Sequence, residues 1–350
     1  MNSEGEDPMA VAVVGVGRMG RHHARTYAKL PGAKLVAVVD ADADRAGQVA
    51  DEYGCEALGS VEELLARFPG AAVSVAVPTK FHAAAAEPLL RRGVPCLIEK
   101  PLAPSVADAR RLASLAAEHG AVLQVGHTER FNPAVRAVAA MKVTPRFLEI
   151  DRVSPMTFRS LDVGVVMDLM IHDLDIVLML AGSGIAKVDA VGVAVLGEAE
   201  DVADARLTFE NGCVANLTAS RLALKTERKL RLFSEAAYVS LDYQRRSGVL
   251  IRRTAHDASL ARVRAQLEAG ADLSDLDYGE LVQVEELSMD VPAGEEDPLT
   301  AELTSFLDAA RRGSAPAVDA EAGYAAVDAA ERVLASMHAH AWEGRKGIRL

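Results

Sequence analysis

The chain has 350 residues, half of them apolar and a quarter charged, which is enough for two globular domains of ordinary size. Its 38 basic and 50 acidic residues give a net charge of −12 without any basic block, so nucleic acid is excluded as a general partner. There is no apolar run long enough to span a membrane, no signal-peptide pattern at the acidic start, and no metal-ligand spacing among Cys55, Cys96 and Cys213. We therefore expect a reduced, cytoplasmic protein that binds neither nucleic acid nor membrane.

The first part of the chain, after a flexible tail over residues 1–8, alternates short apolar runs with longer helical stretches. Such runs, apolar on both faces and bounded by Gly, Pro or Asp, indicate buried parallel strands. The predicted strands are 10–14, 34–39, 55–58, 72–77, 95–98 and 121–125. The predicted helices are 18–30, 42–53, 61–67, 81–92 and 105–119. This alternation predicts a doubly wound parallel α/β sheet, a Rossmann domain, over residues 9–130.

The alternation of short apolar runs and helical stretches ends at about residue 131. Helices are predicted at 133–141, 165–180, 299–312 and 320–339, and strands at 188–196, 203–210, 213–220, 229–234 and 237–243. Glu210-Asn211-Gly212 is a hairpin signal between two of these strands. Consecutive strands joined by short turns predict an α+β domain over residues 131–345 with a large, mostly antiparallel sheet. Residues 245–295 are poorly patterned and receive no prediction.

A glycine-rich turn follows the first predicted strand. Gly15, Gly17 and Gly20 form Gly-x-Gly-x-x-Gly, with Arg18 and Met19 inside the motif. The glycines permit a tight turn, a close approach of backbone to a pyrophosphate, and packing of the helix on the strand. Asp40, which ends the second strand, is placed to bind ribose hydroxyls and repel a 2′-phosphate. We expect NAD rather than NADP, although Arg45 keeps NADP open; the alternative is an ordinary strand–helix turn.

Two further groups of residues could carry chemistry. Glu99-Lys100-Pro101 follows the fifth strand at the ligand-binding edge of the sheet, where Pro101 would fix the turn, with a cis bond as one option. Asp168 and His172 are four residues apart on a predicted helix, with Asp175 on the same face. A carboxylate beside an imidazole suits proton transfer near neutral pH. The alternatives are a solvated Lys–Glu pair and a histidine satisfied between the domains.

Taken together, these residues resemble the Gfo/Idh/MocA family of NAD(P)-dependent oxidoreductases. The resemblance rests on the turn, on Glu99-Lys100-Pro101, on Asp168-x-x-x-His172, and on three further motifs. These are Pro78-Thr79-x-x-His82, Gly126-His127 and Arg130-Phe131-Asn132-Pro133. It implies a dehydrogenase of sugars or cyclitols that forms homodimers or homotetramers through its second sheet. The family also contains a non-catalytic dinucleotide-binding regulator, which is the alternative of another class.

The resemblance also implies roles for single residues. Lys100, Asp168 and His172 would be catalytic. Cofactor contacts would come from the turn, Asp40, Arg45, Pro78, Thr79, His82, Glu99 and Lys100. Substrate contacts would come from Lys100, His127, Arg130, Asn132, Asp168 and His172. A bound metal is not expected, because His22 and His23 point to different helix faces and His172 has no second imidazole at helical spacing.

The subgroup is indicated by residues 125–133 and 162–175. They look most like bacterial members that oxidise the 3-hydroxyl of UDP-N-acetylglucosamine, whose ketone an aminotransferase then uses for lipid A or surface polysaccharide. An inositol or free-sugar dehydrogenase is the alternative. Arg130, Arg152, Arg159 and Arg221 could meet a diphosphate, or pair with the surplus acids. Gly164 alone remains of the glycine run that commonly precedes the catalytic Asp, a departure that could reshape the substrate wall.

Overall fold

The computed structural model describes residues 7–156, 163–196, 198–253, 257–270, 282–288, 297–342 and 345–346, and it contains two compact units. The first unit comprises Met1–Asn132, Leu174–Ile176 and Val291–Arg332. The second comprises Pro133–Asp173, Val177–Asp290 and Val333–Leu350. The predicted domain boundary near residue 130 stays a prediction. Each compact unit is made of several separate segments of the chain. Every helix in the described part is too short or too polar to cross a membrane.

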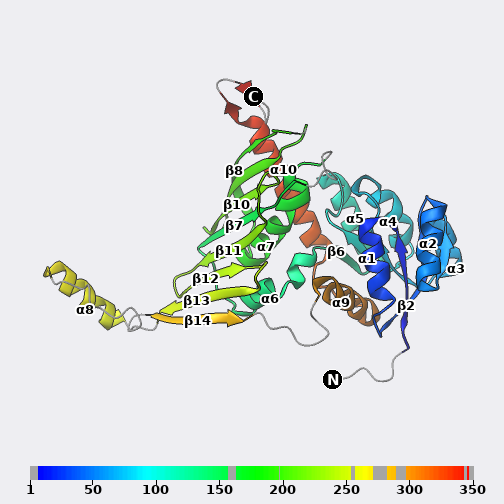
Figure 1. The fold of residues 1–350 in the computed structure, drawn as a ribbon, viewed down its shortest axis with the longest axis horizontal. Helices are drawn as coiled ribbons and strands as arrows, with labels where there is room; N and C mark the ends of the chain where they lie inside the picture. The colour runs from blue at the N-terminus through cyan, green and yellow to red at the C-terminus, as the bar shows by residue number, and fades with distance from the viewer. Residues whose placement is uncertain are drawn as a thin grey trace. The chain divides into compact units, whose positions relative to one another are not determined.

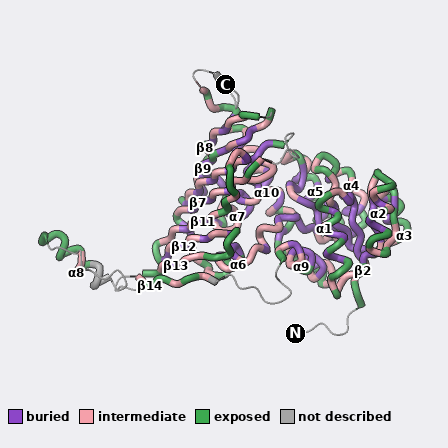
Figure 2. The backbone as a smooth tube through the Cα atoms, viewed as in Figure 1, coloured by how far each residue is buried: buried purple, intermediate pink, exposed green. Residues whose placement is uncertain are grey.

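The first unit is built on a parallel sheet whose strand order is β3-β2-β1-β4-β5-β6 (Figure 1). The strands are β1 Met9–Val14, β2 Ala33–Val39, β3 Glu56–Leu58, β4 Ala72–Val75, β5 Cys96–Glu99 and β6 Leu123–Gly126. All residues of β4, β5 and β6 are buried, as expected for strands covered on both faces. Figure 2 shows buried residues of this unit, in purple, among its helices. The predicted Rossmann sheet is therefore confirmed, with its order reversing between β1 and β4, where such sheets bind ligands.

Three helices of this unit begin at a residue whose side chain caps them. The helices of the unit are α1 Arg18–Tyr27, α2 Ala43–Tyr53, α3 Val61–Arg67, α4 His82–Leu90 and α5 Val106–His119, with 3₁₀ turns η1 Thr79–Phe81 and η2 Thr128–Phe131. Asp42, Ser60 and Ser105 each accept the backbone N–H three residues ahead. The predicted helices are confirmed with shifted ends; α1, for example, ends at Tyr27 rather than at residue 30.

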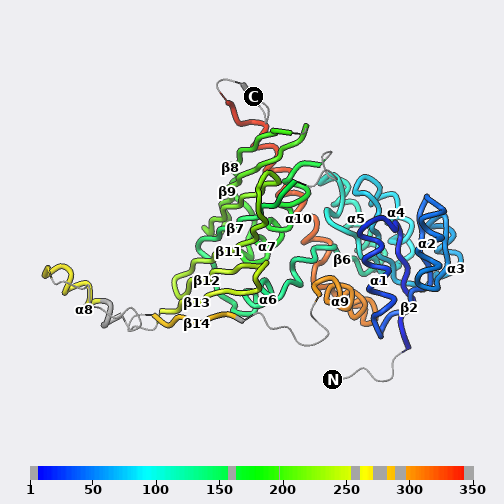
Figure 3. Tube along the Cα trace, viewed as in Figure 1, coloured from blue at the N-terminus to red at the C-terminus, as the bar shows by residue number. Residues whose placement is uncertain are grey.

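A helix from late in the chain completes the core of the first unit. Helix α9, Pro298–Arg312, lies beside α1, although about 270 residues separate the end of α1 from the start of α9 (Figure 3). Leu303, Phe306 and Leu307 join the buried cluster around Val11 and Tyr27. Their spacing places them on one face of the helix. Part of helix α10, Ala320–Ala339, also belongs to this unit.

The second unit contains an eight-stranded sheet with the order β14-β13-β12-β11-β7-β10-β9-β8 (Figure 1). The strands are β7 Phe147–Val153, β8 Ile185–Val193, β9 Val202–Phe209, β10 Val214–Ser220, β11 Glu227–Phe233, β12 Ala237–Asp242, β13 Ser247–Arg253 and β14 Val282–Ser288. Among these described strands the β7–β10 pair alone is parallel, so the predicted mostly antiparallel sheet is confirmed. The predicted hairpin joins β9 and β10, with Gly212 at φ +83°.

Several elements of this unit were not predicted. Strand β7 lies inside the sheet, and β13, β14 and α8 Asp257–Glu268 fall in the segment without a prediction. The predicted helix over 133–141 is confirmed as α6, Pro133–Ala140, which lies along the sheet with helix α7, Ile171–Ala181 (Figure 1). The predicted helix over 165–180 is confirmed, but it opens with a π-helical turn, η3 Val166–Met170. A short hairpin, β15 Ala341–Trp342 and β16 Arg345–Lys346, follows α10.

The two faces of the eight-stranded sheet differ. Leu148 and Ile150 of β7 and Leu232 of β11 are fully buried on one face. On the other face the rings of Phe147, Phe233 and Tyr238 contact one another in tilted arrangements, with centroids 5.5 and 4.9 Å apart, and remain half-buried. The helices cover the first face, whereas the second keeps apolar surface accessible within this chain.

Candidate functional site

The glycine-rich turn has the shape that the sequence predicts. Gly15 adopts φ +85°, and a Cβ there would lie 2.7–2.8 Å from atoms of Val77, so no other residue fits. A Cβ on Gly20 would lie 1.8 Å from the Gly15 carbonyl oxygen. Gly17, by contrast, has no atom within 4 Å of the position that a Cβ would occupy, and it caps α1 without a side-chain hydrogen bond. The N-terminus of α1 is therefore open to an anion.

A cavity of about 670 Å³ opens over this turn. Its walls include Gly15, Gly17, Arg18, Met19, Asp40, Arg45 and Pro78, all predicted cofactor contacts, together with Val77 and Phe81. A mostly apolar cleft with an open helix N-terminus fits a dinucleotide, whose phosphates need N–H donors and whose adenine needs apolar walls. Gly20, Thr79, His82, Glu99 and Lys100 do not line this cavity.

Asp40 stands at the end of β2 in the position for ribose binding. Its carboxylate accepts the backbone N–H of Val16 at 2.9 Å and that of Asp42 at 3.0 Å. Arg45 lies 3.3 Å from the same carboxylate, and its side chain is 43% exposed. The acid is thus fixed by backbone donors, while Arg45 is an exposed positive charge beside it. The negative charge that opposes NADP and the positive charge that would favour it therefore lie side by side.

Glu99 is held inside the first unit by a histidine. The Glu99 Oε1 atom lies 2.8 Å from His23 Nε2, and both side chains are buried. Burial alone would raise the pKa of Glu99, but the hydrogen bond and charge of His23 and the nearby Lys100 charge leave it lowered. The carboxylate is therefore ionised directly before Lys100. The Lys100–Pro101 bond is cis, the option the sequence left open.

Two predicted residues of this unit are enclosed by protein. His127 is fully buried, and burial lowers its pKa. The Arg130 guanidinium forms two hydrogen bonds, of 2.6 and 2.7 Å, with the buried carboxylate of Asp175. Asn132 donates to Glu129 at 3.1 Å. Asp175 is therefore engaged by Arg130, a pairing that the helix-face argument from sequence did not foresee.

Two arginines of the second unit also form ion pairs with buried carboxylates. Arg152 forms two 2.7 Å hydrogen bonds with Asp173, and Arg221 lies 2.6 Å from Asp201. All four of these side chains are buried. This pairing favours the ion-pair interpretation over diphosphate binding for Arg152 and Arg221. Arg159, the remaining arginine of that group, lies outside the described residues.

Asp168 and His172 lie at the start of the long helix of the second unit. Asp168 is in the π-helical turn and His172 is in the first turn of α7. Glu200 accepts the backbone N–H of Val166 at 3.0 Å, and its side chain fills the space beside Gly164, where a Cβ would lie 2.0 Å from Oε1. Gly164 thus lets a buried carboxylate cap the turn that carries Asp168. Lys100 belongs to the first unit and this pair to the second.

Glu302 is a residue of interest that the sequence analysis missed. It is fully buried on α9, accepts a hydrogen bond from the Thr128 hydroxyl at 2.9 Å, and has no hydrogen-bond partner on Oε1 among the described residues. Burial and the charge of Glu99 raise its pKa well above the usual range. The signal was available, because Glu302 falls between Leu299, Leu303 and Phe306 on the apolar face of its helix.

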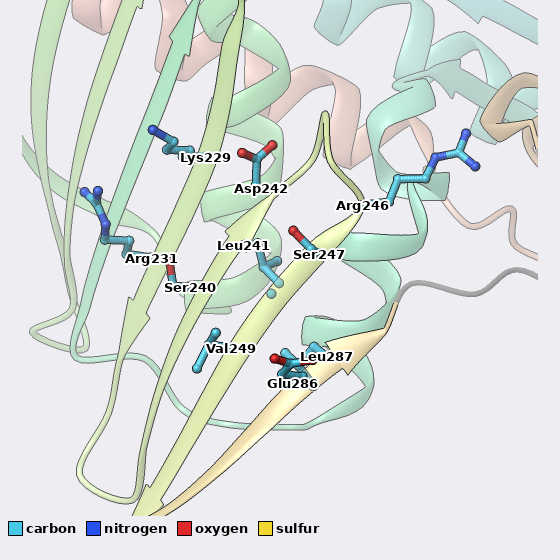
Figure 4. A pocket seen from close by; sticks show the side chains of 11 residues that line it. Lys229, Arg231, Ser240, Leu241, Asp242, Arg246, Ser247, Val249, Glu286 and Leu287 are labelled. Carbon is cyan, nitrogen blue, oxygen red and sulfur yellow. The ribbon is translucent and has the colours of Figure 1, made fainter.

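A second cavity, of about 580 Å³, lies on the open face of the eight-stranded sheet (Figure 4). Its charged walls come from Lys229, Arg231, Asp242, Arg246 and Glu286. Arg231 lies 2.7 Å from Glu149, and Lys229 lies 3.0 Å from Glu227, so carboxylates already neutralise these two cations. This cavity therefore differs from the glycine-rich turn, where the N-terminus of α1 is open. Within the described ranges there is no cluster of three or more metal-ligating side chains.

Comparisons with known proteins give one consistent result. Residues 9–127 match the model of the Gfo/Idh/MocA oxidoreductase family with an NAD-binding Rossmann fold, and residues 140–240 match a Gfo/Idh/MocA C-terminal domain. The chain is 44% identical, over 67% of its length and 74% of the other, to UDP-N-acetylglucosamine 3-dehydrogenase of Acidithiobacillus ferrooxidans. It is 32% identical to the NAD⁺-dependent scyllo-inositol 2-dehydrogenase of Bacillus subtilis, over 62% of this chain and 68% of that one.

A solved structure agrees over almost the whole chain. It is that of UDP-N-acetylglucosamine 3-dehydrogenase GnnA from Acidithiobacillus ferrooxidans, with a TM-score of 0.81 and 36% identity. The match covers 95% of this chain and 98% of that one. The likeness therefore includes both sheets.

Proposed function

Because the chain belongs to the Gfo/Idh/MocA family and is an NAD(P)-dependent dehydrogenase of that family, we propose that it oxidises a secondary hydroxyl of a sugar derivative. The substrate we propose is UDP-N-acetylglucosamine, oxidised at its 3-hydroxyl to the 3-keto sugar nucleotide. The observation that carries this choice is the likeness to GnnA over 95% of the chain. The resemblance of residues 125–133 and 162–175 to the same subgroup supports it.

The proposed chemistry divides the proton transfer between three residues. His172 accepts the proton of the hydroxyl, and Asp168 orients the ring and stabilises the imidazolium. Lys100 donates a hydrogen bond to the reacting oxygen and favours its deprotonation. A bound dinucleotide would supply the nicotinamide ring as acceptor for the hydride from the carbon that bears the reacting oxygen. Positioned groups of this kind accelerate proton transfer by roughly 10²–10⁴-fold.

We propose NAD as the preferred cofactor. Asp40 is fixed by two backbone N–H groups, so it cannot move aside without losing them. Its negative charge opposes a 2′-phosphate and suits two ribose hydroxyls. Arg45 weakens this opposition by neutralising part of the charge, which makes NADP the secondary cofactor rather than an excluded one.

An inositol dehydrogenase is the second candidate, favoured by the similarity to scyllo-inositol 2-dehydrogenase. One experiment separates the two candidates: the protein is incubated with NAD and either UDP-N-acetylglucosamine or a panel of free sugars and inositols, and NADH absorbance is followed. Reduction with the sugar nucleotide alone supports the first proposal. Reduction with an inositol alone replaces it, and reduction with neither substrate class refutes both.

We also propose a homo-oligomer, a dimer or a tetramer, assembled through the open face of the eight-stranded sheet. The half-buried rings of Phe147, Phe233 and Tyr238 provide apolar contact area there, and exposed contiguous apolar surface commonly marks an interaction site. Charged pairs such as Arg231–Glu149 surround the rings. A single-chain mass by light scattering at micromolar concentration would contradict this proposal.

A further inference from the structure

The His82 ring connects two loops of the first unit. It begins α4 and is 1% exposed. Its Nδ1 atom lies 2.9 Å from the carbonyl oxygen of Pro101, and its Nε2 atom lies 2.9 Å from the carbonyl oxygen of Val77. The resemblance to the family implied a cofactor contact for His82, but the ring is occupied by these two backbone groups and does not line the dinucleotide cavity.

The two carbonyl partners determine how many hydrogen bonds the His82 ring can form in each protonation state. Carbonyl oxygens only accept hydrogen bonds, so each ring nitrogen can bond here only by carrying a hydrogen. A neutral imidazole has one N–H and serves one loop at a time, whereas an imidazolium serves both. Burial lowers the pKa of His82, and hydrogen bonds to the carbonyls of Val77, Pro101 and Leu102 and the charge of Glu99 oppose that effect. The hydrogen bond to Pro101 is buried and the one to Val77 is partly buried, so the loss of the donor leaves a carbonyl with little access to water.

The two loops are those that matter for the proposed reaction. Val77 follows β4, lines the dinucleotide cavity, and packs against Gly15 of the glycine-rich turn. Pro101 follows β5 and is bonded directly to Lys100. Strands β4 and β5 are hydrogen-bonded neighbours, so their loops leave the same edge of the sheet. The His82 ring lies between the two loops, and it donates to one of them when neutral and to both when protonated.

We infer that His82 is a positioning residue that holds the turn bearing Lys100 at a fixed place relative to the dinucleotide cavity. The inference rests on the proposed function, in which Lys100 acts on the reacting oxygen. Without the ring, the Pro101 and Val77 carbonyls lose the donor that they share, and the turn that bears Lys100 loses this support. The glycine-rich turn and Asp40 still hold the dinucleotide. Misplacement of a reacting group by about 1 Å lowers turnover by up to 10²-fold.

The test measures turnover and dinucleotide affinity separately in His82→Ala and His82→Gln, with His119→Ala at an exposed helix end as the control. We expect His82→Ala to lower kcat by about 10–100-fold while the Kd for NAD changes by less than about threefold. His82→Gln should recover part of kcat, because its amide donates to one carbonyl. Circular dichroism at the assay temperature checks that each variant is folded. Unchanged kcat in both folded variants overturns the inference, as does a loss of NAD affinity as large as the loss of kcat.

A double-mutant cycle separates failure of the inference from failure of the proposed function. If His82 acts through Lys100, His82→Ala should cost nothing further in the Lys100→Met background. Full turnover of Lys100→Met would refute the role of Lys100 in the proposed function. Loss of turnover in Lys100→Met with equal, additive losses from His82→Ala in both backgrounds would instead refute the positioning role alone.

Discussion

A pair of alanine substitutions in the glycine-rich turn should separate folding from dinucleotide binding. In Gly15→Ala the new Cβ lies 2.7–2.8 Å from the backbone of Val77, and the residue keeps φ +85°. Positive φ costs an L-residue roughly 1–2 kcal/mol, and overpacking adds about 1–3 kcal/mol. The sum, about 3.5 kcal/mol at its centre, corresponds to a fall in Tm of about 7–14 °C for a unit of this size.

Gly17→Ala is the matched control, because it adds the same methyl group two residues away. Its φ is −66°, and no atom lies within 4 Å of the new Cβ, so the Tm should change little. The methyl group, however, stands at the open N-cap of α1 on the wall of the cavity. There it blocks the close approach of a pyrophosphate, and NAD affinity should fall by at least about tenfold, or about 1.4 kcal/mol.

Thermal unfolding followed by circular dichroism and NAD titration by calorimetry give the two readouts. We expect Gly15→Ala to unfold at a lower Tm than the parent, and Gly17→Ala to bind NAD more weakly at an unchanged Tm. If Gly17→Ala bound NAD as tightly as the parent, the pyrophosphate would not lie at this turn. If Gly15→Ala unfolded at the parent temperature, the close approach to Val77 would not constrain the fold.

Three further outcomes follow from the same geometry. Asp40→Ser should relax the preference for NAD, measured as the ratio of Kd values for NADP and NAD; equal affinities in the parent would mean that Arg45 dominates. Lys100→Met, His172→Ala and Asp168→Asn should each lower kcat by roughly 10²–10⁴-fold with little change in NAD affinity, and full turnover of the first two would refute the site. Glu302→Gln should raise Tm, and it should do so more at pH 8 than at pH 5. The pKa of Glu302 is raised in the folded state, so the folded protein loses stability as pH rises from the ordinary carboxyl pKa towards that raised value. Glutamine does not ionise and is spared this loss. A Tm difference that is the same at both pH values would show that Glu302 is ionised in the folded protein.

The Rossmann sheet could be predicted because its signals are local. Each strand is a short apolar run, and caps such as Asp42, Ser60 and Ser105 stand where the helices begin. Strand β7 was missed although Leu148 and Ile150 alternate with Glu149 and Asp151, because the charged half of such a pattern resembles a loop. Its place inside the sheet comes from pairing with β10 and β11, which lie more than 60 residues away.

The candidate residues could be found from motifs, but not their partners. The spacing of Asp168, His172 and Asp175 on a regular helix suggested one shared face, whereas the helix opens with a π turn and Asp175 pairs with Arg130. Similarly, nothing local joins His23 to Glu99, 76 residues away. Long-range pairs of this kind depend on the order of strands and helices in the finished fold, and a single sequence does not encode them in any short window.

Arginines hold two carboxylates of helix α7, those of Asp173 and Asp175. Asp173 is neutralised by Arg152 through two short hydrogen bonds in a buried setting, and removal of either partner from such a pair typically costs about 3–5 kcal/mol. Glu200, admitted by the missing side chain of Gly164, fixes the first turn through the Val166 N–H. Gly164, which remains of the glycine run described above, therefore has a structural role, because it leaves room for the Glu200 side chain. Since a larger residue at position 164 would displace Glu200, the place of Asp168 depends on a residue that need not touch the substrate.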